Sequence, residues 1–179
     1  FPLAFVALLA SFVSSLSAPR DAVLPFVFAA LALVVSDVAT RDGRAGTVAS
    51  VRSIPRLREN YVWWKLGSTS LLSLLFCPAA ILRTIPRGTL AMVALVVGIF
   101  FVAAAATALG LTTSNPKTFI VGFLSFWYVV VNDHGANPLW DFAGFYGRAT
   151  PSTIAGYAIL SLVAIGLTQA FYRARLRTS

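Results

Sequence analysis

Long apolar runs alternate with short polar segments along this chain. A helix needs about 20 apolar residues to cross the hydrocarbon core of a membrane, and six runs are candidates. They cover residues 1–19, 22–39, 61–82, 88–111, 118–131 and 150–172. Every acidic residue lies at or beyond the end of a run. The pattern predicts an all-α integral membrane protein, a single domain with six transmembrane helices.

The composition supports this class of protein. Hydrophobic residues make up 58% of the chain and charged residues 11%, whereas soluble proteins contain about 25% charged residues. The net charge of +8 could indicate a nucleic-acid partner, but the basic residues separate apolar runs instead of forming one basic face. We therefore expect a lipid bilayer around the chain and no nucleic acid bound to it.

The chain begins at Phe1, and Met92 is its only methionine. We therefore expect that part of the N-terminus is missing. Residues 1–19 have no basic segment ahead of their apolar stretch, as a signal peptide would have. The interpretation is a membrane span whose beginning is absent.

The basic residues predict the orientation, because Lys and Arg are enriched in cytoplasmic loops. Counted on alternate sides of the six runs, they divide ten to four. The larger set is Arg41, Arg44, Arg52, Arg56, Arg58, Lys65, Lys117, Arg173, Arg175 and Arg177, and the smaller set is Arg20, Arg83, Arg87 and Arg148. The count places residues 40–60, the turn at 112–117 and the C-terminal tail in the cytoplasm.

The fifth run, "TFIVGFLSFWYVVV", is short for a membrane span. At 1.5 Å per residue it reaches only about 21 Å. The next stretch, "NDHGANPLWDFAGFYGRAT", is too apolar for an exposed loop, yet its glycines and proline interrupt regular helix. The two facts predict a re-entrant segment at the outer face. Its predicted gate residues are Gly135, Pro138, Trp140, Phe142 and Gly144.

The segment "DGRAGTVASVRSIPRLRENYVWWK" joins the second run to the third. Together with the preceding Arg41 it contains six of the fourteen basic residues. Thr47 can cap a short helix on which Val48, Val51 and Ile54 recur at three-residue steps. We expect this helix, residues 47–53, to lie along the membrane surface.

A basic elbow, "PRLREN", follows this helix and leads directly into the third run. Pro55 ends the helix or starts the next one, and the long stem of Lys65 allows its charge to reach the interface. Two interpretations of the whole segment stay open. It is either a basic loop that sets topology and touches anionic lipid, or a docking element for a cytoplasmic partner.

The order of these residues is similar to that in a known family. Arg41 and Asp42 form a charged pair, Gly46 and Thr47 follow, Pro55 and Arg56 end the short helix, and Lys65 begins the next span. In this arrangement the chain resembles the permease subunits of type-2 ABC transporters. The residues that the resemblance assigns to coupling are Arg41, Asp42, Gly46, Thr47, Val48, Val51, Pro55, Arg56, Arg58 and Lys65.

The resemblance implies that the helix at 47–53 is a coupling helix seated on an ABC ATPase subunit. It further implies an exporter in the bacterial cytoplasmic (inner) membrane, in which two permeases, identical or related, work with two ATPases. ATP and magnesium would bind to the ATPase and not to this chain. In this chain "GRAGTVAS" has no Lys after its glycines, so it is not a phosphate-binding loop. We expect no cofactor and no enzyme activity in the chain itself.

Two other classes of protein stay open. A secondary carrier, or a structural membrane subunit, would need no ATPase. Carriers usually place ionisable groups near the middle of the membrane, and the runs contain none there, which leaves a carrier of neutral substrates. An intramembrane hydrolase is the third hypothesis, because Asp133, His134 and Asp141 could form an acid–base cluster. His134 is the only histidine and Cys77 the only cysteine, so we expect no metal site built from several such ligands.

Overall fold

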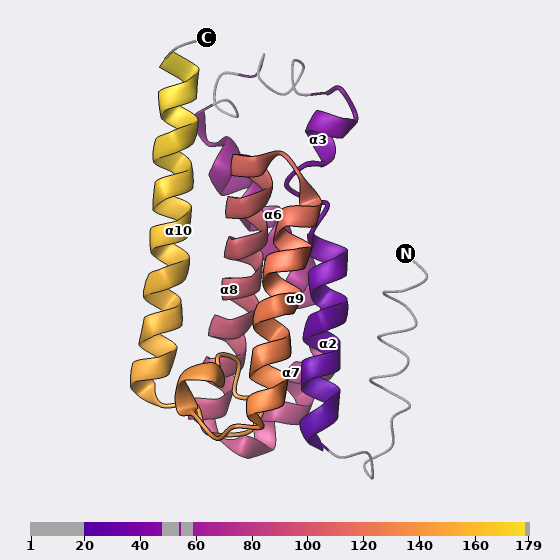
Figure 1. Ribbon diagram of the computed structural model, residues 1–179, viewed down its shortest axis with the longest axis vertical. Helices are drawn as coiled ribbons and strands as arrows, with labels where there is room; N and C mark the ends of the chain where they lie inside the picture. Colours follow the sequence, from indigo (N-terminus) through magenta and orange to yellow (C-terminus); the bar gives the residue numbers. More distant parts are fainter. Residues whose placement is uncertain (1–19, 48–53, 55–58, 178–179) are drawn as a thin grey trace.

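The computed structural model describes residues 20–47, Ile54 and 59–177 (Figure 1). This part of the chain is all-helical and contains no strand, which confirms the predicted fold class for the described residues. The helices are α2 (Arg20–Val35), α3 (Arg41–Arg44), α6 (Tyr61–Phe76), α7 (Pro78–Thr84), α8 (Thr89–Thr113), α9 (Pro116–Asp133) and α10 (Pro151–Arg177), with short 3-10 helices η1 (Ile85–Arg87) and η2 (Pro138–Trp140). The first predicted run, 1–19, lies outside the described residues.

Helix α8 lies at the centre of the bundle and packs against α2, α6, α9 and α10 (Figure 1). Its buried face is rich in small residues, including Gly98, Ala103 and Ala106. Small side chains let neighbouring helices approach closely, which is how helices associate where lipid replaces water. At Gly110 the approach is so close that an added Cβ would lie 2.6 Å from the Cβ of Ala39.

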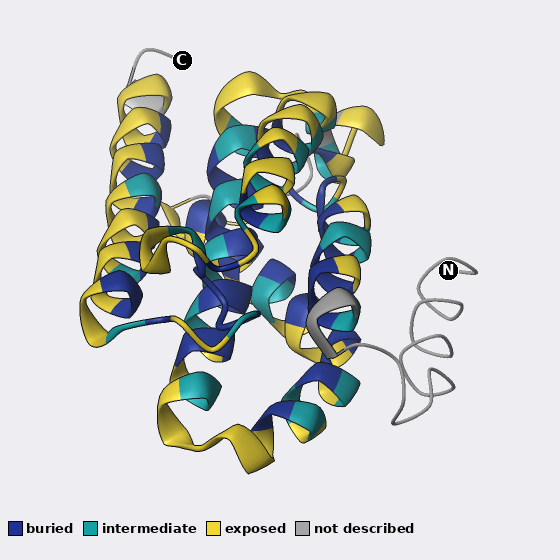
Figure 2. Cartoon of the chain, turned by 60° about the horizontal axis from the view of Figure 1, so that its bottom comes forward, coloured by how far each residue is buried: buried dark blue, intermediate teal, exposed yellow. Residues whose placement is uncertain are grey.

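Among the described residues, two helices are long and apolar enough to cross a membrane, Thr89–Thr113 and Pro151–Arg175. The bent pair of α6 and the segment Pro78–Arg87 makes a third if it is counted as one span. The outward face of α10 is exposed along its length (Figure 2). It presents Leu160, Leu162 and Leu167, exposed by 50%, 60% and 67%. An apolar face of this size is compatible with a membrane protein, in which lipid would cover it.

The predicted third run, 61–82, is not one straight helix. The chain bends by 64° between α6 and the segment that begins at Pro78. Proline has no N–H group to continue the hydrogen-bond ladder of α6, but it suits the first turn of a new helix. Cys77 therefore becomes the joint between α6 and α7, and its side chain is fully buried in the core.

Two other helices differ in length from their predicted runs. Helix α9 has 18 residues, about 27 Å at 1.5 Å per residue, but most of the added residues are polar and it is not among the described helices that are long and apolar enough to cross a membrane. Asn115 caps its start by accepting the N–H of Lys117 at 3.0 Å. Helix α2 ends at Val35 instead of 39, and residues 36–40 form turns. Helix α9 is longer than the predicted run 118–131 because polar residues at its two ends, such as Lys117 and Asp133, are also helical.

The helices place the basic residues at two opposite ends of the bundle (Figure 1). One end contains α3, the start of α6, the α8–α9 turn and the end of α10, and we call it the α3 end. The other end contains η1 and the segment between α9 and α10, and we call it the η1 end. The described members of the larger predicted set, such as Lys117 and Arg173, lie at the α3 end, whereas Arg83, Arg87 and Arg148 lie at the η1 end.

The close approach at Gly98 gives a test of the packing. A Cβ added there would lie 2.4 Å from the Cβ of Ala143 and 2.8 Å from its Cα. We expect Gly98→Ala to destabilise the protein by about 1–3 kcal/mol, measured by thermal unfolding in detergent. Gly166→Ala in α10 is the matched control, because nothing lies within 4 Å of its added Cβ. Equal unfolding temperatures for the two variants would contradict this packing.

Candidate functional site

An ion pair joins the two ends of the basic segment at the α3 end of the bundle. The Lys65 Nζ lies 2.9 Å from Oδ2 of Asp42 and donates to the carbonyl oxygen of Val38 at 3.0 Å. The Tyr61 hydroxyl donates to the same Asp42 oxygen at 3.0 Å. Residues 42 and 65, which are 23 positions apart in the sequence, are thereby held together.

The burial of Lys65 was not expected from the sequence. Its side chain is only 7% exposed, whereas that of Asp42 is 24% exposed. The stem does extend toward the end of the bundle, as snorkelling predicts, but the ammonium group ends on a carboxylate and a carbonyl instead of in water. If one partner were removed or moved away, the other charge would be left poorly solvated. The pair therefore favours the arrangement in which Lys65 and Asp42 are in contact.

The environment of Asp42 shifts its pKa. Burial alone would raise the pKa of this carboxyl group, but the hydrogen bonds from Lys65 and Tyr61 and the positive charges of Lys65 and Arg41 lower it below its ordinary value. The folded protein therefore holds Asp42 in its charged form. The neighbouring pair between Arg44 and Asp37 is different, because these side chains are 61% and 53% exposed.

Helix α10 is connected to the same site. The ring of Tyr172 stacks on that of Tyr61 with 5.5 Å between centroids, and the amide of Gln169 donates to the carbonyl oxygen of Glu59 at 3.3 Å. We call Asp42, Lys65, Tyr61 and Tyr172 the junction cluster. It joins α3, the start of α6 and the last turns of α10.

The structure describes about half of the residues predicted for coupling. Asp42 and Lys65 come together, and Arg41 is exposed on α3, a single helical turn that the sequence did not predict. Thr47 is exposed, and its N–H bonds the carbonyl oxygen of Asp42 at 3.0 Å, with Gly46 at φ +70 before it. The predicted helix at 47–53 and the elbow lie outside the described residues, as do Val48, Val51, Pro55, Arg56 and Arg58.

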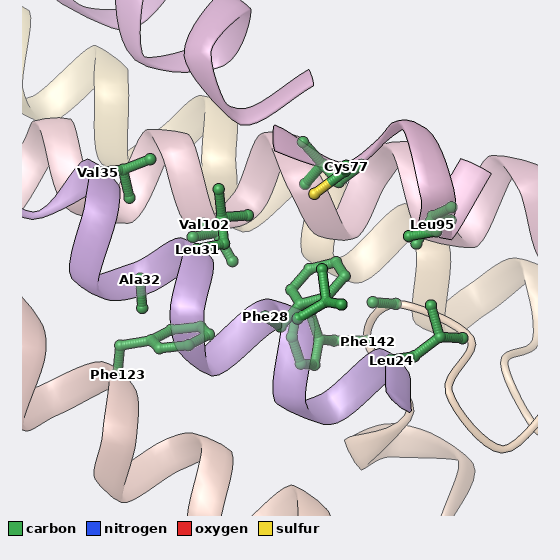
Figure 3. Packing of buried hydrophobic residues seen from close by; sticks show 14 of the residues in the cluster. Leu24, Phe28, Leu31, Ala32, Val35, Cys77, Leu95, Val102, Phe123 and Phe142 are labelled. Atoms are coloured by element: carbon green, nitrogen blue, oxygen red, sulfur yellow. The ribbon is translucent and has the colours of Figure 1, made fainter. Parts of the chain in front are cut away.

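The predicted gate residues lie together at the η1 end. Phe142 is fully buried beside Phe28 (Figure 3). Its ring centroid lies 5.5 Å from that of Phe28 and 5.2 Å from that of Phe126. Gly135 and Gly144 are also buried and have positive φ angles. Trp140 is half-buried and Pro138 exposed. The segment after α9 is thus non-helical for most of its length, and part of it enters the core.

Asp141 organises this segment, a role that the sequence did not assign to it. Its side chain is buried, and its two oxygens accept backbone N–H groups from Tyr146 at 3.3 Å, Arg148 at 2.7 Å and Ala149 at 3.0 Å. The only sign of this role in the sequence is a carboxylate between two aromatic residues, followed by glycines. A carboxylate in such a place needs N–H donors.

The hypothetical acid–base cluster has no shared hydrogen bond within the described residues. Asp133 accepts the N–H of Asn137 at 2.9 Å, and His134 is exposed with Nδ1 2.8 Å from the carbonyl oxygen of Asn132. Asp141 is occupied by backbone groups. The part of the chain that the structure describes also holds no group of three or more His, Cys, Asp and Glu that could bind a metal ion.

Replacing Asp42 tests the ion pair. Asp42→Asn leaves the buried Lys65 charge without its counter-charge, and we expect a loss of about 1–3 kcal/mol in unfolding free energy. Asp37→Asn removes the charge of an exposed pair and should cost about 0–1 kcal/mol. Thermal unfolding of both variants in detergent measures the difference. If both lose the same stability, the buried pair has no special role.

The lowered pKa of Asp42 predicts a pH dependence. Its folded pKa is below the unfolded one, so the contribution to stability is present at neutral pH and is lost as pH falls below about 4. We expect the stability gap between the wild type and Asp42→Asn to stay constant from about pH 7 to pH 5 and to shrink below that window. A gap that persists unchanged in strong acid would contradict the charge-based explanation.

Comparison of the chain with family models, with curated proteins and with solved structures found no match. The geometry of the junction cluster and of the segment around Asp141 is therefore the basis for a functional argument.

Proposed function

We propose that this chain is the membrane-spanning permease subunit of an ATP-driven ABC transporter, acting as an exporter with a separate ATPase subunit. The observation that carries the proposal is the ion pair of Asp42 with Lys65. It ties together the two ends of a basic segment that has the residue order of a coupling element. While the pair is formed, a force on that segment would reach α2 and α6 together, because the pair links the two ends.

The packing suggests a route for such a force. Helix α2 begins at the η1 end and leads, through the turns at 36–40, to Asp42. On α2, Phe28 contacts Phe142 and Phe145 of the non-helical segment, with centroids 5.5 Å and 5.0 Å apart. A shift of α2 as a rigid body would therefore disturb the proposed gate at the opposite end.

The remaining parts of the proposal follow from this arrangement. The α3 end faces the cytoplasm, since it carries the larger set of basic residues. Six spans, a second permease copy or related subunit, and a substrate path lined by α2 and α9 complete the working unit. The segment around Phe142 closes the outer end of that path. ATP and magnesium bind to the ATPase.

The decisive test is purification of the tagged chain from its native host in mild detergent, followed by mass spectrometry. We expect a stoichiometric ATPase to copurify, because the basic segment docks on it. The double reversal Arg56→Glu, Arg58→Glu should abolish this copurification.

The matched control reverses the same number of charges on α10, with Arg173→Glu and Arg175→Glu, and should retain the ATPase. Loss from both variants would indicate a bulk charge effect and not docking. If the folded wild-type chain brings no ATPase, a carrier or structural subunit without an ATPase replaces the proposal.

A further inference from the structure

An open pocket of about 380 Å³ lies at the η1 end of the bundle. It lies between the start of α8 and the segment that follows Asp141. Its lining includes Arg87, Leu90, Ala91, Gly144, Tyr146 and Gly147. A volume of this size is within the range of sites that bind small molecules or headgroups.

Arg87 places a positive charge in this pocket. Its Nη1 donates to the carbonyl oxygens of Gly144 at 3.3 Å and Phe145 at 3.2 Å. These two bonds fix the guanidinium group but use only one of its three nitrogens. An arginine has five N–H donors in a planar fork that suits phosphate oxygens. The anchored side chain thus offers donors for a phosphate without having to be ordered first.

The charges around the pocket favour an anion. Among the residues at this end whose side chains are described, the acidic groups are Asp133 and Asp141, and both already accept backbone N–H groups. Arg83 and Arg148 lie at the same end and add positive charge. The space beside the lining residue Gly147 is open, because a Cβ added there would meet nothing within 4 Å.

Leu90, which lines the pocket, also begins a strip of exposed apolar residues on α8. Leu90, Val93 and Val96 follow at three-residue steps and are exposed by 46%, 49% and 44%. Within the described residues, Thr89–Thr113 is one of two helices that are long and apolar enough to cross a membrane. An Arg at the helix start with an apolar strip beside it matches a molecule that has a charged headgroup and a hydrocarbon chain.

We propose that this pocket binds the phosphate group of a phospholipid, with Arg87 holding the phosphate and the strip of α8 contacting an acyl chain. The site is separate from the junction cluster and needs no ATPase. It would fix one lipid beside the segment that Asp141 organises.

The test is a lipid titration of the purified full chain, followed by native mass spectrometry. Phosphatidylglycerol should bind, whereas diacylglycerol with the same chains and glycerol 3-phosphate should bind at least about tenfold more weakly. Arg87→Gln should weaken phosphatidylglycerol binding by about tenfold or more. Lys117→Gln, at the opposite end of the bundle, is the control and should leave the affinity within about twofold.

Arg87→Gln also removes two bonds to the backbone, so a second variant keeps Arg87 intact. Leu90→Glu places a negative charge in the pocket lining and should weaken binding more than Leu90→Gln, which has the same size and loses the same apolar contact without adding a charge. Equal binding of diacylglycerol, or no loss in either Arg87→Gln or Leu90→Glu, would overturn the proposal. Binding of glycerol 3-phosphate as tight as that of the lipid would also overturn it, because the occupant would then be a soluble phosphate.

Discussion

A non-helical backbone can lie inside an apolar bundle only if its N–H groups find partners. Asp141 meets this requirement for the segment between α9 and α10, because its carboxylate accepts three backbone N–H groups. The arrangement allows Phe142 to lie among aromatic rings from four helices. These rings are Phe28 of α2, Phe101 of α8, Phe126 of α9 and Tyr157 of α10. Much of the core at the η1 end is built around this one side chain.

The α3 end also depends on a carboxylate, but its partners differ. Asp42 binds the side chains of Lys65 and Tyr61, which belong to another helix, whereas Asp141 binds the backbone of its own segment. Side-chain partners can separate and meet again without unfolding the backbone around them. The contrast fits the proposed function, in which the α3 end receives a force and the η1 end keeps the closed segment in shape.

The sequence predicted features that depend on composition over many residues. The apolar runs located α8 and α10 well, and the aromatic residues around Trp140 indicated that the segment after α9 is not an ordinary exposed loop. Features decided by one residue or by tertiary contacts were missed. Pro78 was visible within the third run, but whether a proline bends a helix or begins a new one depends on its neighbours. The burial of Lys65 could not be predicted, because it requires the carbonyl of Val38 and the carboxylate of Asp42 to lie beside α6.

The outward faces of α9 and α10 differ in a way that bears on the substrate path. The exposed face of α10 is formed by leucines such as Leu160 and Leu167, as expected for contact with lipid chains. The exposed face of α9 includes Gly122 and Ser125 beside Val121 and Tyr128. Helix α10 also exposes glycines, Gly156 and Gly166, but it buries its mid-helix hydroxyl groups, Ser161 and Thr168. The exposed hydroxyl group of Ser125 is therefore the difference, and such groups are favoured where a membrane helix meets another helix or water instead of lipid. Among the described side chains of α2, the exposed ones are the large apolar residues Phe26 and Leu33. In the proposed permease, the polar lining of the path would therefore come from α9.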